Sequence, residues 1–210
     1  MAPGIHDFSV SIPEGFYPML LDDEVASEDW ARDVVARATQ ELGSADHEGA
    51  VEAELAELRL RLLAQLNPYL TAAVYLRPEH FLSVGAVMTF QIAEVGPDQD
   101  AAWFLREARE LAGDPDAEGN TILFDGWEHV IPSGRLAGVH QVVEYLDEPL
   151  DGEDAPAEGW VEARTVFGVF PPDADEMVHF TFTTADLNAF GDMPAETESI
   201  IASLSIELDR

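Results

Sequence analysis

Hydrophobic and polar residues follow two different periods along this chain, and the change of period divides it into helices and strands. Residues 7–12 alternate apolar and polar positions, and Pro13-Glu14-Gly15 stops the alternation. A period of two is typical of a half-buried strand, and a Pro and Gly pair is typical of a turn. The sequence therefore predicts a first strand over 7–12.

Two helices are predicted next, and together they form a helical hairpin over residues 27–66. Ser27 stands before two acidic residues as the expected N-cap of the first helix, and Gly43 is expected to end it. The second helix is expected from about residue 44, with an i,i+4 ion pair between Glu57 and Arg61. Its apolar stripe is Val51, Leu55, Leu58, Leu62 and Leu66.

The rest of the chain is mostly extended. Residues 71–76 and 81–95 predict a hairpin that turns at Arg77-Pro78-Glu79. A helix follows over 100–112, with Phe104, Ala108 and Leu111 facing inward. Four antiparallel strands are expected at 122–131, 135–146, 160–170 and 176–183, then a helix capped by Asp192 and a short strand at 205–208.

These elements predict an α+β fold, with an antiparallel sheet of about six or seven strands and helices packed on its faces. No linker-like segment divides the chain, so residues 1–210 are expected to form a single domain. Its parts would be the helical hairpin at 27–66 and a β-rich C-terminal half at 121–208 that contains the terminal helix.

Charge narrows the function classes. The chain carries 42 acidic residues and ten basic ones, all arginine, for a net charge of −32. Nucleic acids and anionic membranes are bound through clustered cations, so neither is an expected partner. The acidity has three explanations: genomic composition, a surface for a basic protein partner, or nucleic-acid mimicry, which the even spread of acids favours least. The N-terminus has no signal-peptide pattern, so a cytoplasmic protein is expected.

Candidate metal chemistry is weak. The spacing of Asp114, Asp116, Glu118, Gly119 and Asp125 resembles an EF-hand calcium loop, with oxygen ligands at alternating positions and a glycine at the turn. A Glu stands where Asp or Asn is usual, an Asp replaces the closing Glu, and the following segment is strand-like. An ordinary acidic turn is the favoured interpretation, and calcium binding is the alternative.

Other catalytic signals are missing. His129, His140 and His179 fall on three separate predicted strands without ligand spacing, so structural or surface histidines are expected. The chain has no cysteine, no nucleophile elbow and no phosphate-binding glycine loop. Trp103, Trp127, Trp160 and Phe170 are expected in the core. No metal or other cofactor is predicted.

The start and the C-terminal half of the chain carry a resemblance. The segment from Phe8 to Phe16 is a strand that leads to Pro and Gly before an aromatic residue, and the apolar-Thr strand 177–183 precedes a terminal helix containing Ile201-Ala202-Ser203-Leu204. This order resembles the PsbP-like fold group, which includes Mog-type Ran-binding proteins, LpqN-type lipoproteins and bacterial secretion adaptors. The resemblance implies an antiparallel sheet flanked by helices and a non-enzymatic, protein-binding role.

We therefore expect a cytoplasmic protein-interaction module, such as an adaptor, a chaperone or an immunity-like partner. The expected contact surface is one polar face of the strands, formed by His140, Glu144, Glu162, Arg164, His179 and Thr181. The alternative is a small-ligand carrier or an enzyme with a pocket between the sheet and the N-terminal helices. The oligomeric state is left open.

Overall fold

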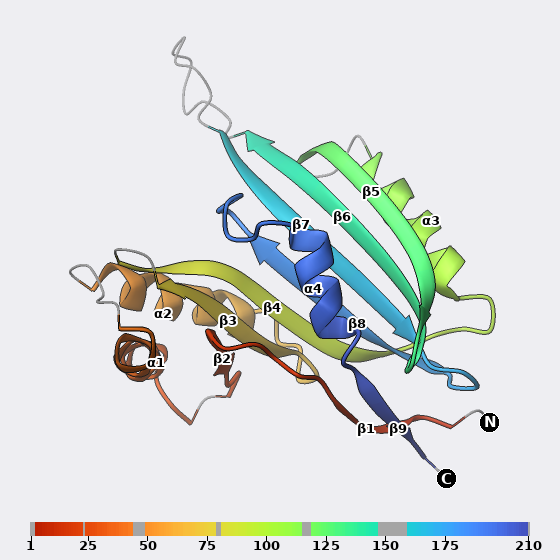
Figure 1. Cartoon of the computed structure of the whole chain (residues 1–210), viewed down its shortest axis with the longest axis horizontal. Coiled ribbons are helices and arrows are strands. Elements are labelled where there is room, and N and C mark those ends of the chain that lie inside the picture. The colour runs from red at the N-terminus through yellow and green to blue at the C-terminus, as the bar shows by residue number, and fades with distance from the viewer. Residues whose placement is uncertain are drawn as a thin grey trace. The chain divides into compact units, whose positions relative to one another are not determined.

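The computed structural model describes residues 3–22, 24–43, 49–78, 81–114, 119–146 and 159–209. Figure 1 shows its helices and strands. The helices are α1 (Ser27–Leu42), α2 (Ala50–Leu63), α3 (Ala101–Ala112) and α4 (Met193–Ile201). The strands are β1 (Ile5–Ser9), β2 (Phe16–Met19), β3 (Thr71–Pro78), β4 (Leu82–Glu94), β5 (Asn120–Ile131), β6 (Gly134–Leu146), β7 (Gly159–Phe170), β8 (Glu176–Thr184) and β9 (Ser205–Leu208).

Seven strands form one antiparallel sheet in the order β2-β3-β4-β8-β7-β6-β5, and β1 pairs with β9 in a separate two-stranded sheet. Helices pack against the larger sheet. The predicted α+β class, with its antiparallel sheet of six or seven strands, is confirmed. Strands β5 to β8 are consecutive in the chain, and each pairs antiparallel with the next.

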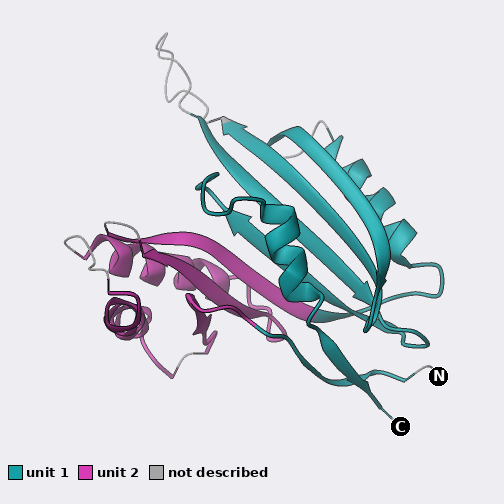
Figure 2. Cartoon of the chain, viewed as in Figure 1, with its two compact units in different colours: residues 1–11, 92–210 teal, residues 12–91 magenta. Residues whose placement is uncertain are grey.

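The chain divides into two compact units, shown in Figure 2. Unit 1 comprises Met1–Ser11 and Ile92–Arg210, and unit 2 comprises Ile12–Gln91. The proposal that residues 1–210 form one domain stays a prediction. Each unit is described by itself below.

Unit 2 is a three-stranded antiparallel segment, β2-β3-β4, covered by the helical hairpin of α1 and α2. Both helices lie within the predicted range of 27–66, although α2 ends at Leu63. The helix end at Gly43, which has the left-handed φ of 68°, and the ion pair between Glu57 and Arg61 at 4.0 Å agree with the prediction. Buried side chains from both layers fill the space between the helices and the strands. They include Tyr17, Met19, Trp30, Val34, Val51, Leu55, Val74 and Leu76.

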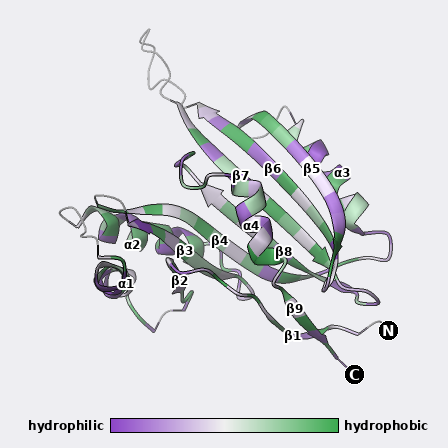
Figure 3. Ribbon diagram, in the orientation of Figure 1, coloured by the Kyte–Doolittle hydropathy of each residue, from purple (hydrophilic) through white to green (hydrophobic). Residues whose placement is uncertain are grey.

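Unit 1 contains β5 to β8 with one helix on each face (Figure 1). We call these the α3 face and the α4 face. Under α3 lies an apolar cluster that includes Phe104, Val139 and Val166. The α4 face carries the fully buried Phe167 and Phe182, whose rings meet edge to face. Hydrophobic and hydrophilic residues alternate along these strands (Figure 3), as expected where successive side chains point to opposite faces.

Several local predictions are wrong. Ser27 is not the N-cap: α1 begins at Ser27, and Ala26 occupies the cap position. Leu66 is 87% exposed because α2 ends at Leu63 and Leu66 adopts a positive φ of 52°, which breaks the helical stripe. Leu111 is 68% exposed because the apolar cluster under α3 extends along the helix only to Ala108.

Two strand boundaries also differ from the prediction. The predicted turn at Arg77-Pro78 is still strand, because Arg77 pairs with Ser83 and Pro78 with Leu82. Pro is tolerated there because it stands at the end of the strand. The edge strand β2 was not predicted, since it has only four residues and one of them is Pro18. The first strand lies at Ile5–Ser9, slightly earlier than expected.

Candidate functional site

The six residues predicted as one contact face are divided between both faces of the sheet. His140 lies opposite Thr165 in the register of β6 and β7, so His140 and Glu144 belong to the α4 face. Arg164 and Glu162 occupy the alternate positions of β7 and belong to the α3 face. His179 pairs with Gly168, and Thr181 pairs with Val166, which places both on the α3 face too. The prediction of a single face is therefore wrong. Which residues of different strands share a face depends on the register between the strands, and the pattern within one strand does not contain that information.

On the α4 face, His140 has a structural environment. Its Nδ1 lies 3.0 Å from Oγ1 of Thr165, which is completely buried. Burial lowers the pKa of His140, and the negative charges of Asp125 and Asp192 oppose that shift. The partial burial of the His140 ring favours its neutral form, and the contact with the buried Thr165 hydroxyl indicates a packing role for this side chain.

A second contact on the α4 face ties the terminal helix to the sheet. Trp127 Nε1 donates a hydrogen bond of 2.5 Å to Oε2 of Glu198 on α4. The other oxygen of Glu198 lies 3.5 Å from Nε2 of His129. Gly138 lies directly under the indole, and a Cβ at this position would collide with the ring. Sequence reasoning missed this contact because 71 residues separate Trp127 from Glu198.

On the α3 face, His179 is covered by the helix. Its ring centroid lies 6.0 Å from that of Phe104 on α3. Burial lowers the pKa of His179, with no compensating charge. His179 is therefore on the opposite face from His129 and His140, so the three histidines are not brought together.

Beyond α3 on the same face, four side chains form what we call the aromatic–arginine cluster: Tyr145, Trp160, Glu162 and Arg164. The rings of Tyr145 and Trp160 stack with centroids 4.2 Å apart and planes inclined by 13°. Arg164 Nη2 donates a hydrogen bond of 2.6 Å to Oε1 of Glu162 and a longer one of 3.4 Å to the Tyr145 hydroxyl. Trp160 is 46% exposed, so the prediction that it lies in the core is wrong.

The strands fix the geometry of this cluster. Tyr145 is directly opposite Trp160, and Val143 is opposite Glu162, in the continuous register of β6 and β7. Gly119 lies against the cluster from behind: a Cβ at that position would be 2.5 Å from Val143 Cγ1 and 2.9 Å from Tyr145 Cε1. The cluster is thus built on rigid elements. One signal in the sequence could have indicated that Tyr145 and Trp160 pair. The two residues stand at equal distances from the ends of the acidic segment 147–158, as residues opposite each other in a hairpin do.

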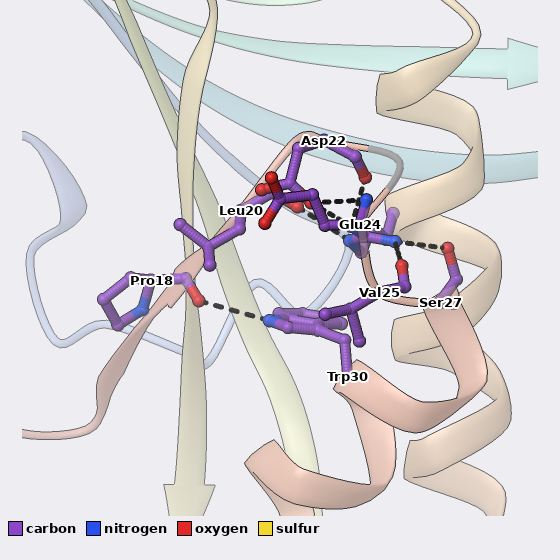
Figure 4. A network of polar contacts seen from close by, with 8 residues as sticks. Pro18, Leu20, Asp22, Glu24, Val25, Ser27 and Trp30 are labelled. Atoms are coloured by element: carbon purple, nitrogen blue, oxygen red, sulfur yellow. Dashed lines mark hydrogen bonds and ion pairs between the residues drawn. The ribbon is translucent and has the colours of Figure 1, made fainter.

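Unit 2 contains a polar network of a different kind, the Arg59 cluster (Figure 4). Arg59 is only 1% exposed. Its guanidinium donates to three backbone oxygens, those of Leu20 at 2.8 Å, Val25 at 3.0 Å and Asp22 at 2.7 Å. It also donates to Oγ of Ser27 at 2.9 Å. The Ser27 hydroxyl therefore accepts a hydrogen bond from the buried arginine, and it does not cap α1.

The Arg59 cluster holds the segment between β2 and α1 against α2. Asp22 Oδ1 lies 3.6 Å from Nη2, and the guanidinium carbon lies 5.9 Å from the centroid of the Trp30 ring, whose Nε1 donates to the oxygen of Pro18 at 3.4 Å. All these partners belong to the protein itself. The hydrogen bonds of the guanidinium are thus made within the protein, which indicates a structural role for the cluster.

Metal binding finds no support in the described part of the chain, where no three His, Asp or Glu side chains are grouped to hold an ion. Residues 115–118 of the EF-hand-like loop lie outside the described residues, as does the acidic segment 147–158. Calcium binding at Asp114 to Asp125 stays a prediction. None of the described helices is long and apolar enough to cross a membrane.

Comparison with models of known protein families and with curated proteins found no match for this chain. The function must therefore be argued from the residues themselves.

Proposed function

We propose that this chain is a non-enzymatic, cytoplasmic protein-interaction module that docks its partner on the aromatic–arginine cluster. The observation that carries the proposal is the stacked pair of Tyr145 and Trp160 beside the guanidinium of Arg164. Trp, Tyr and Arg are the residue types most enriched among side chains that dominate binding energies at protein interfaces. Here all three stand together on two paired strands.

The exposure of the cluster supports a docking role over a packing role. Trp160 leaves almost half of its surface to solvent, and the side chain of Arg164 is 33% exposed. A large aromatic side chain gains about 1.5–3 kcal/mol when a partner removes it from water. The stack and the ion pair hold both side chains in place before binding, which lowers the entropy lost on association.

Charge supports a basic protein as the partner. With a net charge of −32, the molecule attracts cationic surfaces over long range and speeds their encounter. Ten arginines and no lysine make nucleic acid and anionic membrane unfavourable partners. We also propose that the chain belongs to the PsbP-like fold group, because its first strand leads to Pro and Gly before Phe16 and its apolar-Thr strand precedes a terminal helix.

The packing of unit 2 weighs against the alternative, a ligand carrier or enzyme with a pocket between the sheet and the N-terminal helices. The side chains between α1, α2 and the strands include Val34, Leu55 and Val74, each completely buried. A ligand would have to displace this core. We therefore favour the interaction module.

The test compares two aromatic truncations. The partner is isolated on immobilised protein, and its affinity for purified wild type, Trp160→Ala and Tyr69→Ala is then measured by calorimetry. Tyr69 is an aromatic side chain that is more exposed than Trp160, at 76%, and it is far from the cluster in sequence. We expect Trp160→Ala to weaken binding about 30-fold, the effect of losing a dominant interface residue of about 2 kcal/mol. Tyr69→Ala is expected to bind within twofold of wild type.

Equal affinities of wild type and Trp160→Ala would overturn the docking site. Thermal unfolding of each variant separates lost binding from lost structure, since Trp160 is on the surface and its truncation should lower stability only modestly. Arg164→Gln adds a second check, because its effect on affinity should shrink as salt rises.

A further inference from the structure

Unit 1 also contains an open cleft of about 940 Å³. It lies at one end of strands β5 to β8, and the aromatic–arginine cluster lies near the other end of β6 and β7. Three chain segments surround it: the approach to α3 at Val95–Ala101, the β5–β6 turn and the β7–β8 connection. This volume lies within the range of sites that hold small organic molecules. The cleft shares no residue with the aromatic–arginine cluster.

The walls of the cleft are preformed. Pro97, Pro132, Pro171 and Pro172 line it, and each ring fixes its own φ. Val95 N donates to the backbone oxygen of Asp175 at 2.9 Å, which ties the first wall to the third. Such a site loses little conformational entropy when a ligand enters.

The β5–β6 turn is held just as closely. Gly134 adopts a φ of +142°, and a Cβ there would collide with the backbone of Phe170 and Pro171. Gln99 Oε1 accepts a hydrogen bond of 2.6 Å from Gly96 N, which fixes the loop before α3. Glycine is thus required where the second wall meets the third.

The lining combines an apolar interior with excess negative charge. Val95, Ile131 and Phe170 supply apolar surface, and three carboxylates, those of Asp100, Asp175 and Glu176, are also present. The single lining cation, Arg135, is paired with Glu128. A cationic ligand with an apolar body matches both properties.

The carboxylates are not equally available. The carboxylate of Asp100 caps α3, because it accepts a hydrogen bond from Trp103 N at 2.8 Å. Its negative charge already interacts with the positive N-terminal end of this helix. Glu176 accepts from Ile5 N at 2.5 Å. The carboxylate of Asp175 is exposed and accepts from no other described residue, which leaves it to meet a ligand.

We propose that this cleft binds a small organic cation, an amine or guanidine carried on a hydrocarbon body. The apolar body would contact Ile131 and Phe170, and the charged group would lie beside Asp175. The proposal is independent of the docking function assigned to the aromatic–arginine cluster, and it needs no chemical step.

The experiment titrates the full chain with 4-phenylbutylamine and follows backbone amide signals by NMR in 150 mM salt, which screens diffuse attraction to the acidic surface. We expect saturable shifts at Val95, Gly96 and Gly134, and none in α1. The uncharged 4-phenylbutanol should bind at least fivefold more weakly, and 4-phenylbutyrate more weakly still.

Asp175→Asn is the test variant, and Asp173→Asn is its matched control. Both side chains are exposed, but Asp173 does not line the cleft, and Asn tolerates its positive φ of 66°. We expect Asp175→Asn to weaken amine binding about fivefold, as the loss of one partly solvated ion pair does, and Asp173→Asn to leave it unchanged. Equal binding of amine and alcohol, equal effects of the two variants, or no shifts at the cleft would each overturn the proposal.

Discussion

Two arginines of this acidic chain are used in opposite ways. Arg59 in unit 2 is buried to 1% exposure, and it donates to three backbone carbonyls and one hydroxyl. Arg164 in unit 1 is one third exposed at its side chain, and its partners are the carboxylate of Glu162 and the hydroxyl of Tyr145. Both side chains carry the same charge, so their different roles follow from their surroundings.

The difference lies in the partners. Backbone carbonyls cannot leave the Arg59 guanidinium without a change in the fold, because the buried guanidinium would then lack acceptors. The contact of Arg164 with Glu162 is only partly shielded from solvent, with side chains 33% and 14% exposed, so a charge on another protein can still reach the guanidinium. A buried arginine on carbonyls therefore indicates a structural role, whereas a partly exposed arginine beside stacked aromatic rings fits the docking role that we propose.

The largest expected effect separates the two arginines by stability. Arg59→Met is expected to lower the free energy of unfolding by roughly 3–5 kcal/mol, because the four hydrogen bonds by which the buried guanidinium holds the segment before α1 are lost. Arg164→Met is the matched change and should cost less, roughly 1–2 kcal/mol, because it leaves the partly buried Glu162 without its charged partner. Urea unfolding followed by fluorescence measures both. Similar losses in the two variants would remove the distinction drawn above.

A smaller effect is expected at Tyr17, a buried side chain of unit 2 whose partner is a side chain and not the backbone. Its hydroxyl donates to Glu41 Oε2 at 3.0 Å. Tyr17→Phe should lower the free energy of unfolding by about 1 kcal/mol, the usual worth of one hydrogen bond. Tyr69→Phe, at an exposed position, is the control and should change nothing measurable.

The same contact predicts a pH dependence. Burial, then the hydrogen bond and the charge of Glu41, raise the pKa of Tyr17 to about 12. Its contribution to stability is complete below the unfolded pKa of about 10 and is lost as the pH rises through the folded value. Absorbance at alkaline pH should show one of the four tyrosines ionising late, and Tyr17→Phe should remove that late step.

The smallest effect concerns His179 under α3 in unit 1. Burial lowers its pKa in the folded state, so the unfolded chain binds the proton more readily. Its share of stability is present above the unfolded pKa of about 6.5 and is lost as the pH falls toward the folded value. His179→Gln should flatten the acid side of the stability profile, measured by urea unfolding between pH 7.5 and 5. A profile parallel to that of wild type would show that burial does not perturb this ring.

Much of the fold could be predicted from interactions between residues that are close in the sequence. Gly43 ends α1 because it tolerates a left-handed φ, and Asp192 caps α4 because its carboxylate accepts from Ala195 N at 3.1 Å. The strands β5 to β8 follow the predicted segments because their alternation is regular. Each of these signals depends on residues within a few positions of one another.

The candidate site was accessible only in part. Glu162 and Arg164 were among the predicted contact residues, and they do lie together. His140 and Glu144 turn to the opposite face, because the pairing of His140 with Thr165 fixes which residues share a side. The stacked partners Tyr145 and Trp160 were not predicted as a pair, since that requires the register of two strands joined by a 12-residue segment.

By itself, the sequence determined most of the elements, their order, the α+β class and the net charge, because capping, periodicity and composition are local or additive properties. Only the tertiary structure decided that Arg59 is buried, that Ser27 accepts its hydrogen bond, and that the partly exposed Trp160 stacks on Tyr145. These outcomes depend on which distant segments meet. The physical reason is that burial and register are set by long-range packing, and no short stretch of sequence contains the partner that fixes them.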